Sequence, residues 1–200
     1  MRQADVFLNG EGEKWLARNL NKLPVLDDPV MTAIGDIRVK PSMTLEVGCS
    51  NGWRVKLMES RWKCRSFGID PMFKTTNWNC RQGTADDLSA FDDGQFDLLI
   101  YGWCLYLCDR EDLFAIVCEG DRVLREGGHL VIHDFHPNKP YKKTYKHVEG
   151  LFSYKMDYAQ LWLANPAYGI VHRVMYDAGD DRTCVTILRK STDNGWPLHA

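Results

Sequence analysis

The stretch LEVGCSNGWRV, residues 45–55, decides the predicted fold. Its apolar run ends at Val47, and Gly48, Ser50 and Gly52 then follow within five residues. Glycines so closely spaced cost conformational entropy and are poor core material, so the backbone there either makes a tight turn or passes close to another molecule. The pattern predicts a buried strand before the small residues and a helix after them.

Short apolar stretches alternate with amphipathic ones on both sides of this turn. The longest amphipathic stretch, 110–128, has an apolar side and ends at Gly127-Gly128, which is typical of a helix. Predicted strands cover 44–49, 66–70, part of 80–87, 96–102 and 129–135, and predicted helices cover 12–22, 53–62 and 110–128. This alternation predicts a parallel sheet with helices on both faces.

The C-terminal part of the chain has a different pattern. Residues 169–177 and 182–190 read as two strands of an antiparallel hairpin, and AGDD at 178–181 reads as its turn. The predicted fold is therefore α/β: a doubly wound, mostly parallel seven-stranded sheet with an antiparallel hairpin at its C-terminal edge.

Composition and charge restrict the class of protein. A chain of 200 residues is long enough for one domain, and a net charge of −2 gives no global reason to expect a nucleic-acid binder. The apolar run 98–108 is too short to span a membrane, and the N-terminus lacks an apolar signal region, so a cytoplasmic protein is expected. The seven cysteines are scattered without a C-x-x-C pair, which argues against a disulfide framework or a structural zinc site.

The turn after the first predicted strand is a candidate ligand site. In an open parallel sheet, ligands bind beyond the carboxyl ends of the strands, and a helix N-terminus offers unpaired N–H groups there. Asp70 ends the next predicted strand 22 residues after Gly48 (70 − 48), the usual distance to an acid that accepts from ribose hydroxyls. The alternative is a plain strand-to-helix turn with no ligand.

The same turn is a poor fit to a dinucleotide. A pyrophosphate site uses G-x-G-x-x-G, whereas here Ser50 and Trp53 occupy the second and third glycine positions. The turn therefore favours a nucleoside cofactor without phosphates, and a nicotinamide-dependent oxidoreductase becomes an unlikely alternative.

These motifs resemble those of class I S-adenosylmethionine-dependent methyltransferases with a Rossmann-like fold, in their small-molecule branch. LEVGCSNG resembles the first motif of that family, GID ending at Asp70 resembles its ribose-binding position, and 83–100 and 121–135 resemble the later strands and helix. The resemblance implies S-adenosyl-L-methionine as cofactor, with Ala85 and Asp86 beside the adenine. The cofactor-binding residues that it implies are Glu46, Gly48, Cys49, Ser50, Gly52, Asp70, Pro71, Ala85, Asp86 and Tyr101.

The catalytic candidates lie in HDFH, residues 133–136, after the fifth predicted strand. A hydroxyl acceptor needs its proton removed, often by a histidine or a carboxylate. In an extended strand end, His133 points to one side and Asp134 and His136 to the other, so Asp134 and His136 are expected to form an oriented base, with His133 as a further candidate. A metal role and a purely structural role for the cluster remain alternatives.

Two further segments need an interpretation. NPAY at 165–168 resembles a signature of methyltransferases that act on amino groups, but it lies far from the fourth strand, so we predict a simple turn. The segment 138–147 carries four lysines and two tyrosines. It is either a solvated loop or a flap over an anionic acceptor, such as a phosphorylated or carboxylated sugar.

The predicted organisation is one methyltransferase domain over 1–200. It comprises an N-terminal helical cap (1–43), a cofactor-binding core (44–135), and an acceptor flap with the C-terminal hairpin (136–190). Residues 7–19 also resemble methylases associated with bacterial surface sugars. The function expected from these observations is methylation of a small molecule or sugar, most simply on oxygen. A non-catalytic S-adenosylmethionine-binding protein on the same fold is the alternative.

Overall fold

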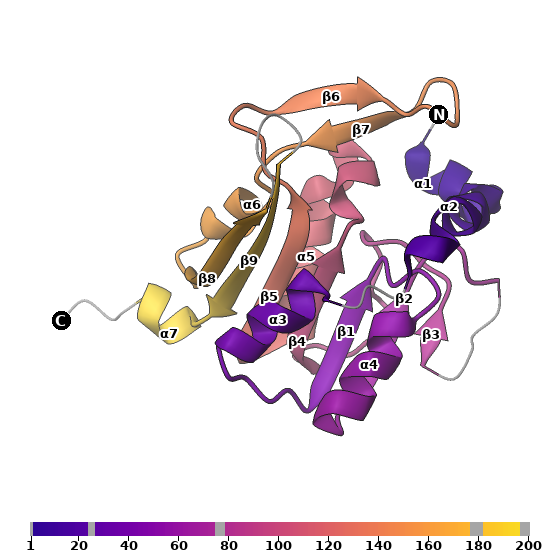
Figure 1. Cartoon of the computed structure of the whole chain (residues 1–200). Helices are drawn as coiled ribbons and strands as arrows, with labels where there is room; N and C mark the ends of the chain where they lie inside the picture. The colour runs from indigo at the N-terminus through magenta and orange to yellow at the C-terminus, as the bar shows by residue number, and fades with distance from the viewer. Residues whose placement is uncertain (1, 24–26, 75–78, 177–181, 197–200) are drawn as a thin grey trace.

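A computed structural model describes residues 2–23, 27–74, 79–176 and 182–196. Its centre is a seven-stranded sheet with the order β3-β2-β1-β4-β5-β9-β8 (Figure 1). The strands are β1 (Met43–Val47), β2 (Arg65–Ile69), β3 (Cys80–Arg81), β4 (Phe96–Gly102), β5 (Leu124–Phe135), β8 (Tyr168–Tyr176) and β9 (Thr183–Lys190). Strands β1 to β5 pair in parallel, and β9 pairs antiparallel with both β5 and β8. The predicted fold class is confirmed. The predicted hairpin turn at 178–181 lies outside the described residues.

The helices cover both faces of the sheet and the edge near the N-terminus (Figure 1). They are α1 (Gln3–Val6), the π-helical turn η1 (Phe7–Glu11), α2 (Gly12–Asn19), α3 (Pro29–Asp36), α4 (Trp53–Trp62), α5 (Leu113–Val123), α6 (Ala159–Leu163) and α7 (Thr192–Gly195). Short 3₁₀ turns cover Leu20–Lys22, Leu105–Leu107 and Arg110–Asp112. None of the helices in the described part of the chain is long and apolar enough to cross a membrane.

Alternation along β4 explains why the sheet needs helices on both faces. Leu98 and Ile100 pack into one cluster with the apolar side of α3, whereas Leu99 and Tyr101 pack into the other with α5 and α6. All seven residues of β4 are buried. A strand buried on both sides reads as a continuous apolar run, which is the pattern that predicted it.

The predicted helix over 110–128 is wrong at its C-terminal end. Helix α5 ends at Val123, and the chain then runs directly into β5, which is twelve residues long. The pairing of β5 with β4 shifts register between Phe96 and Leu98, so Gly127-Gly128 lies within an irregular strand rather than at a helix end. Glycine pairs mark both situations, and only the tertiary pairing distinguishes them.

A second sheet, the β6–β7 hairpin, holds the N-terminal helices in place. It pairs β6 (Tyr141–Thr144) with β7 (Phe152–Lys155) and lies near α1 in Figure 1. The Tyr145 hydroxyl donates to the buried carboxylate of Glu11 at 2.7 Å and accepts from Arg18 at 2.9 Å. Phe7 packs against the Tyr145 ring in a small apolar cluster. The helical cap is thus attached to the rest of the fold by buried contacts.

Candidate functional site

The β1–α4 turn is built from residues in the left-handed region of backbone conformation. Gly48, Ser50 and Gly52 have φ values of 75°, 52° and 76°. The N–H groups of Gly48 and Cys49 both donate to the Ile69 carbonyl, at 2.8 and 3.2 Å, which ties the turn to the end of β2. Only glycine adopts such φ values at little cost, so the sequence of small residues is a requirement of this turn.

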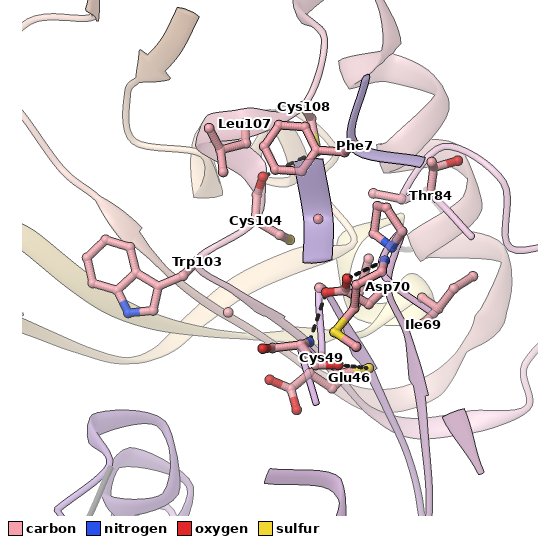
Figure 2. A pocket seen from close by; sticks show the side chains of 18 of the residues that line it. Phe7, Glu46, Cys49, Ile69, Asp70, Thr84, Trp103, Cys104, Leu107 and Cys108 are labelled. Carbon is pink, nitrogen blue, oxygen red and sulfur yellow. Dashed lines mark hydrogen bonds between the residues drawn. The ribbon is translucent and has the colours of Figure 1, made fainter. Parts of the chain in front are cut away.

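A cavity of about 440 Å³ opens beyond the carboxyl ends of β1 and β4. The strand order reverses between these two strands, which is where open α/β sheets bind ligands. Its walls come from the β1–α4 turn, the end of β2, the loop 83–86, the segment after β4, and the N-terminal helices (Figure 2). The volume lies in the range of small-molecule sites.

Eight of the ten residues implied as cofactor-binding line this cavity: Glu46, Gly48, Cys49, Ser50, Asp70, Pro71, Ala85 and Asp86. Gly52 instead shapes the turn, where its N–H donates to the Cys49 carbonyl at 2.9 Å. Tyr101 does not fit the expectation. It is fully buried on the α5 face, with its ring 5.4 Å from that of Trp162, so it is a core residue.

The Asp70 side chain accepts hydrogen bonds from the β1–α4 turn and from its own loop. Its Oδ2 accepts from the Ser50 N–H at 2.8 Å and its Oδ1 from the Met72 N–H at 2.9 Å. Burial raises the pKa of Asp70, and these two backbone donors act in the opposite direction. The carboxylate lines the cavity with lone pairs left for a ligand, so its position suits the ribose hydroxyls of a nucleoside.

Gly48 has a packing role that the sequence did not reveal. A Cβ built on it would lie 2.4 Å from the Cys104 Cβ, because Cys104 follows β4 directly against the turn. A side chain at position 48 would therefore collide with Cys104 before it could reach a ligand in the cavity.

Gly48→Ala is expected to lower the free energy of unfolding by about 2–3 kcal/mol, from overpacking added to backbone strain. Urea unfolding measures this. Gly10→Ala is the matched control, because Gly10 also has a positive φ, of 115°, but nothing within 4 Å of its Cβ position. When Gly48→Ala is combined with Cys104→Gly, the part of the loss in unfolding free energy that comes from overpacking should disappear. Equal losses in both glycine variants would contradict the packing role.

A buried chain of charges forms the floor of the cavity beside β4. Arg54, the second residue of α4, pairs with Glu46 through Nη1, and its Nε donates to the Asp28 Oδ2 at 2.7 Å. Asp28 precedes α3, yet its side chain does not cap that helix. Burial raises the pKa of Glu46 to about 7 despite the opposing effect of Arg54. No local pattern predicts the pairs of Arg54, because Asp28 lies 26 residues and Glu46 lies 8 residues earlier in the chain.

Of the HDFH residues, only His133 lines the cavity. His133 is buried, and its Nδ1 has no hydrogen-bond partner within the described ranges. Burial, and then the nearby Arg54 guanidinium, lower the pKa of His133 to about 4, so the ring is neutral at pH 7. A neutral imidazole in the wall of a cavity has a ring nitrogen that can accept a proton.

Asp134 and His136 do not form the expected oriented base. The Asp134 carboxylate accepts from the backbone N–H groups of Phe135 and Tyr106, at 2.7 and 3.2 Å, and burial raises its pKa to about 7. The His136 Nε2 lies 3.2 Å from Asp157, and neither Asp134 nor His136 lines the cavity. The predicted alternation of faces holds, but it directs His133 rather than His136 to the site.

The basic segment 138–147 does not cover the cavity. None of its residues lines it, and the segment instead forms β6 and the contacts of Tyr145 described above. NPAY is a turn as predicted: the Asn165 Oδ1 accepts from the Ala167 N–H at 3.0 Å. Among the residues that the structure describes, no group of three or more histidine, cysteine, aspartate or glutamate side chains is placed to hold a metal ion.

The N-terminal wall of the cavity consists of residues that were not expected at the site. Ala4, Phe7, Gly12 and Trp15 line the cavity, and Arg2 contacts Asp86 and Asp112 at 3.3 and 2.5 Å. Trp103, on the other side of the view in Figure 2, adds an indole next to His133, with ring centroids 4.7 Å apart. The cavity thus has one end at Asp70 and Ala85 and an aromatic, charged end at Trp103 and Arg54.

A family model described as "Methyltransferase domain" matches residues 45–132. No curated protein is similar enough to count as a match.

Solved structures share the fold at low identity. The 1,6-didemethyltoxoflavin-N1-methyltransferase of Burkholderia thailandensis, with S-adenosylhomocysteine bound, is 15% identical with a TM-score of 0.67, over 90% of this chain and 87% of that one. The N-methyltransferase NodS of Bradyrhizobium japonicum WM9 is 19% identical with a TM-score of 0.60, over 90% and 98%. A methyltransferase of Methanosarcina mazei is 16% identical with a TM-score of 0.62, over 82% and 98%.

Proposed function

We propose that the protein is an S-adenosylmethionine-dependent methyltransferase, with its methyltransferase domain over residues 45–132, and that it methylates a hydroxyl group of a small molecule such as a sugar. The observation that carries the oxygen assignment is His133, which lines the cavity and whose buried Nδ1 has no hydrogen-bond partner within the described ranges. A hydroxyl acceptor must lose a proton, and a neutral imidazole at the wall of the cavity is suited to take it.

The residues divide into two groups by task. Asp70, Ala85 and Asp86 are assigned to the nucleoside, and the β1–α4 turn and Glu46 to the amino-acid end of the cofactor. When bound, S-adenosylmethionine supplies a methyl group that its sulfonium has already activated. The remaining task of the protein is to hold the acceptor in line and exclude water, for which Phe7, Trp15 and Trp103 provide apolar walls.

A turnover assay tests the proposal. The protein is incubated with labelled S-adenosylmethionine and a metabolite extract, and the methylated product is identified by mass spectrometry. An O-methyl product supports the proposal, and an N-methyl or C-methyl product contradicts the oxygen assignment. Cofactor binding without turnover on any fraction would favour a non-catalytic binding protein.

Asp70→Ala is expected to weaken S-adenosylhomocysteine binding by about 1.5–3 kcal/mol, the usual cost of losing a charged hydrogen-bond partner. The melting temperature should also fall, because the N–H groups of Ser50 and Met72 lose their acceptor. Calorimetry of the folded variant measures the affinity. Asp92→Ala, an exposed residue outside the cavity, is the control. Unchanged affinity would remove Asp70 from the cofactor site.

A further inference from the structure

A second pocket, of about 350 Å³, lies between α2 and the segment that follows β6. We propose that it binds an anionic group, a phosphate or a carboxylate, of the acceptor whose hydroxyl is methylated in the first cavity. This inference rests on the proposed function and narrows its substrate class to acidic small molecules.

Positive side chains surround the second pocket. Arg18, Lys22 and His147 line it, and none of the described residues in its lining carries a carboxylate. The first cavity has the opposite charge, because six carboxylates and one arginine are among the described residues that line it. An anionic group is therefore stabilised in the second pocket and repelled from the first cavity.

One face of the N-terminal helical segment supplies most of this pocket. Four lining residues recur in the i, i+3, i+4, i+7 pattern of a single helix face: Trp15, Arg18, Asn19 and Lys22. The Lys22 Nζ donates to the Asn19 Oδ1 at 3.4 Å, which is a long contact for a hydrogen bond. Lys22 and His147 are both exposed, so a ligand can reach their nitrogen atoms.

The third cationic group, Arg18, is held in place by the protein. Its Nη2 donates to the Tyr145 hydroxyl at 2.9 Å and pairs with the buried carboxylate of Glu11. Both contacts use the same nitrogen, and a guanidinium has five N–H donors in a rigid plane. Since Glu11 offsets the charge of Arg18, Lys22 supplies the net positive charge of the pocket and Arg18 supplies fixed donors.

The second pocket and the first cavity share a wall. Trp15 lines both. The centre of the Trp103 ring lies 4.7 Å from that of His133 and 6.2 Å from that of Tyr106, and Tyr106 lines the second pocket. Two successive ring contacts thus connect the proposed base to the basic pocket, and one elongated small molecule can occupy both sites.

Fractionating a metabolite extract by charge tests the acceptor class. Ion exchange separates the extract into anionic, neutral and cationic pools, and each pool is incubated with the protein and labelled S-adenosylmethionine. Transfer to the anionic pool is expected to exceed transfer to either other pool at least about tenfold, the usual effect of one charged hydrogen bond. Phosphatase treatment then distinguishes the two sources, because loss of transfer indicates a phosphate ester and retention indicates a carboxylate. Transfer mainly to the neutral or cationic pool would overturn the proposal, whereas no transfer to any pool would contradict the proposed function itself.

A double variant tests whether the second pocket holds the anionic group. Lys22→Gln combined with His147→Gln should raise the amount of anionic pool needed for half-maximal transfer about tenfold, while the S-adenosylhomocysteine affinity changes less than about twofold. Arg18 is left in place, because it also pairs with the buried Glu11. Lys14→Gln is the matched control, since Lys14 is exposed on the same helix and lines neither site. If the double variant needs no more acceptor than the wild type, or the control needs equally more, the proposal is wrong.

Discussion

Replacing His133 with asparagine is expected to lower turnover by about 10²–10⁴-fold, the usual contribution of a general base. The asparagine keeps a polar side chain of similar reach but cannot accept the acceptor's proton. The affinity for S-adenosylhomocysteine should stay nearly unchanged, because the lost role concerns the acceptor. Rate, cofactor affinity and melting temperature are measured on the same preparation.

The pH dependence gives an independent test of this role. Because the pKa of His133 is lowered to about 4, the wild-type kcat should remain high through pH 6 and fall only as the pH approaches 4. An unperturbed histidine would instead lose activity near pH 6.5. In His133→Asn, the low residual kcat should not show this fall toward pH 4.

His136→Asn is the matched control, because His136 is three residues further along and outside the cavity. It should retain near-normal turnover per folded molecule. If His136→Asn loses the rate and His133→Asn keeps it, the assignment of the base is wrong. A drop in melting temperature with unchanged turnover in His133→Asn would leave only a structural role for that histidine.

Arg54→Met is expected to lower the free energy of unfolding by about 3–5 kcal/mol. Removing the guanidinium leaves Asp28 and Glu46 buried with no opposite charge between them, and both are at most 3% exposed. The deficit should shrink as the pH falls from 8 to 5, because the pKa of Glu46 is raised to about 7 by burial and its protonation removes one of the unpaired charges. Urea unfolding at both values of pH measures the effect.

Arg110→Met controls for the loss of an arginine. Arg110 pairs with Glu111 on the surface, where both side chains are 66% exposed, so its removal should cost less than about 1 kcal/mol at either pH. A loss in Arg54→Met that is small, or that grows as the pH falls, would show that the buried chain of charges is not what stabilises this part of the fold.

The sequence predicted the sheet well, because β1, β2 and β4 carry local signals. Each is a short stretch with several apolar residues, bounded by turn residues, and α4 begins and ends where its pattern does. It brought the glycine turn and Asp70 together for the same reason, since they have a fixed spacing along the chain, and both line the cavity. The end of α5 was misplaced because glycine pairs do not distinguish a helix end from an irregular strand.

The acceptor side could not be predicted, because its residues meet only through tertiary packing. Asp28, Arg54 and His133 come from three elements far apart in the chain, and no spacing rule connects them. The choice of His136 over His133 assumed that an aspartate next to a histidine orients it. In the structure, that aspartate instead accepts from the backbone N–H groups of Tyr106, after β4, and of Phe135, at the end of β5.

The walls of the cavity span nearly the whole described chain, from Ala4 in the first helix to Thr183 in β9. During synthesis, the cavity therefore cannot be complete until the ribosome has released the last strand of the sheet. A ligand bound there contacts both early and late segments, so its binding free energy opposes the unfolding of all of them together. A saturating ligand should therefore raise the melting temperature of the whole chain in a single cooperative transition. A fragment that lacks either the N-terminal helices or β9 should not bind the ligand.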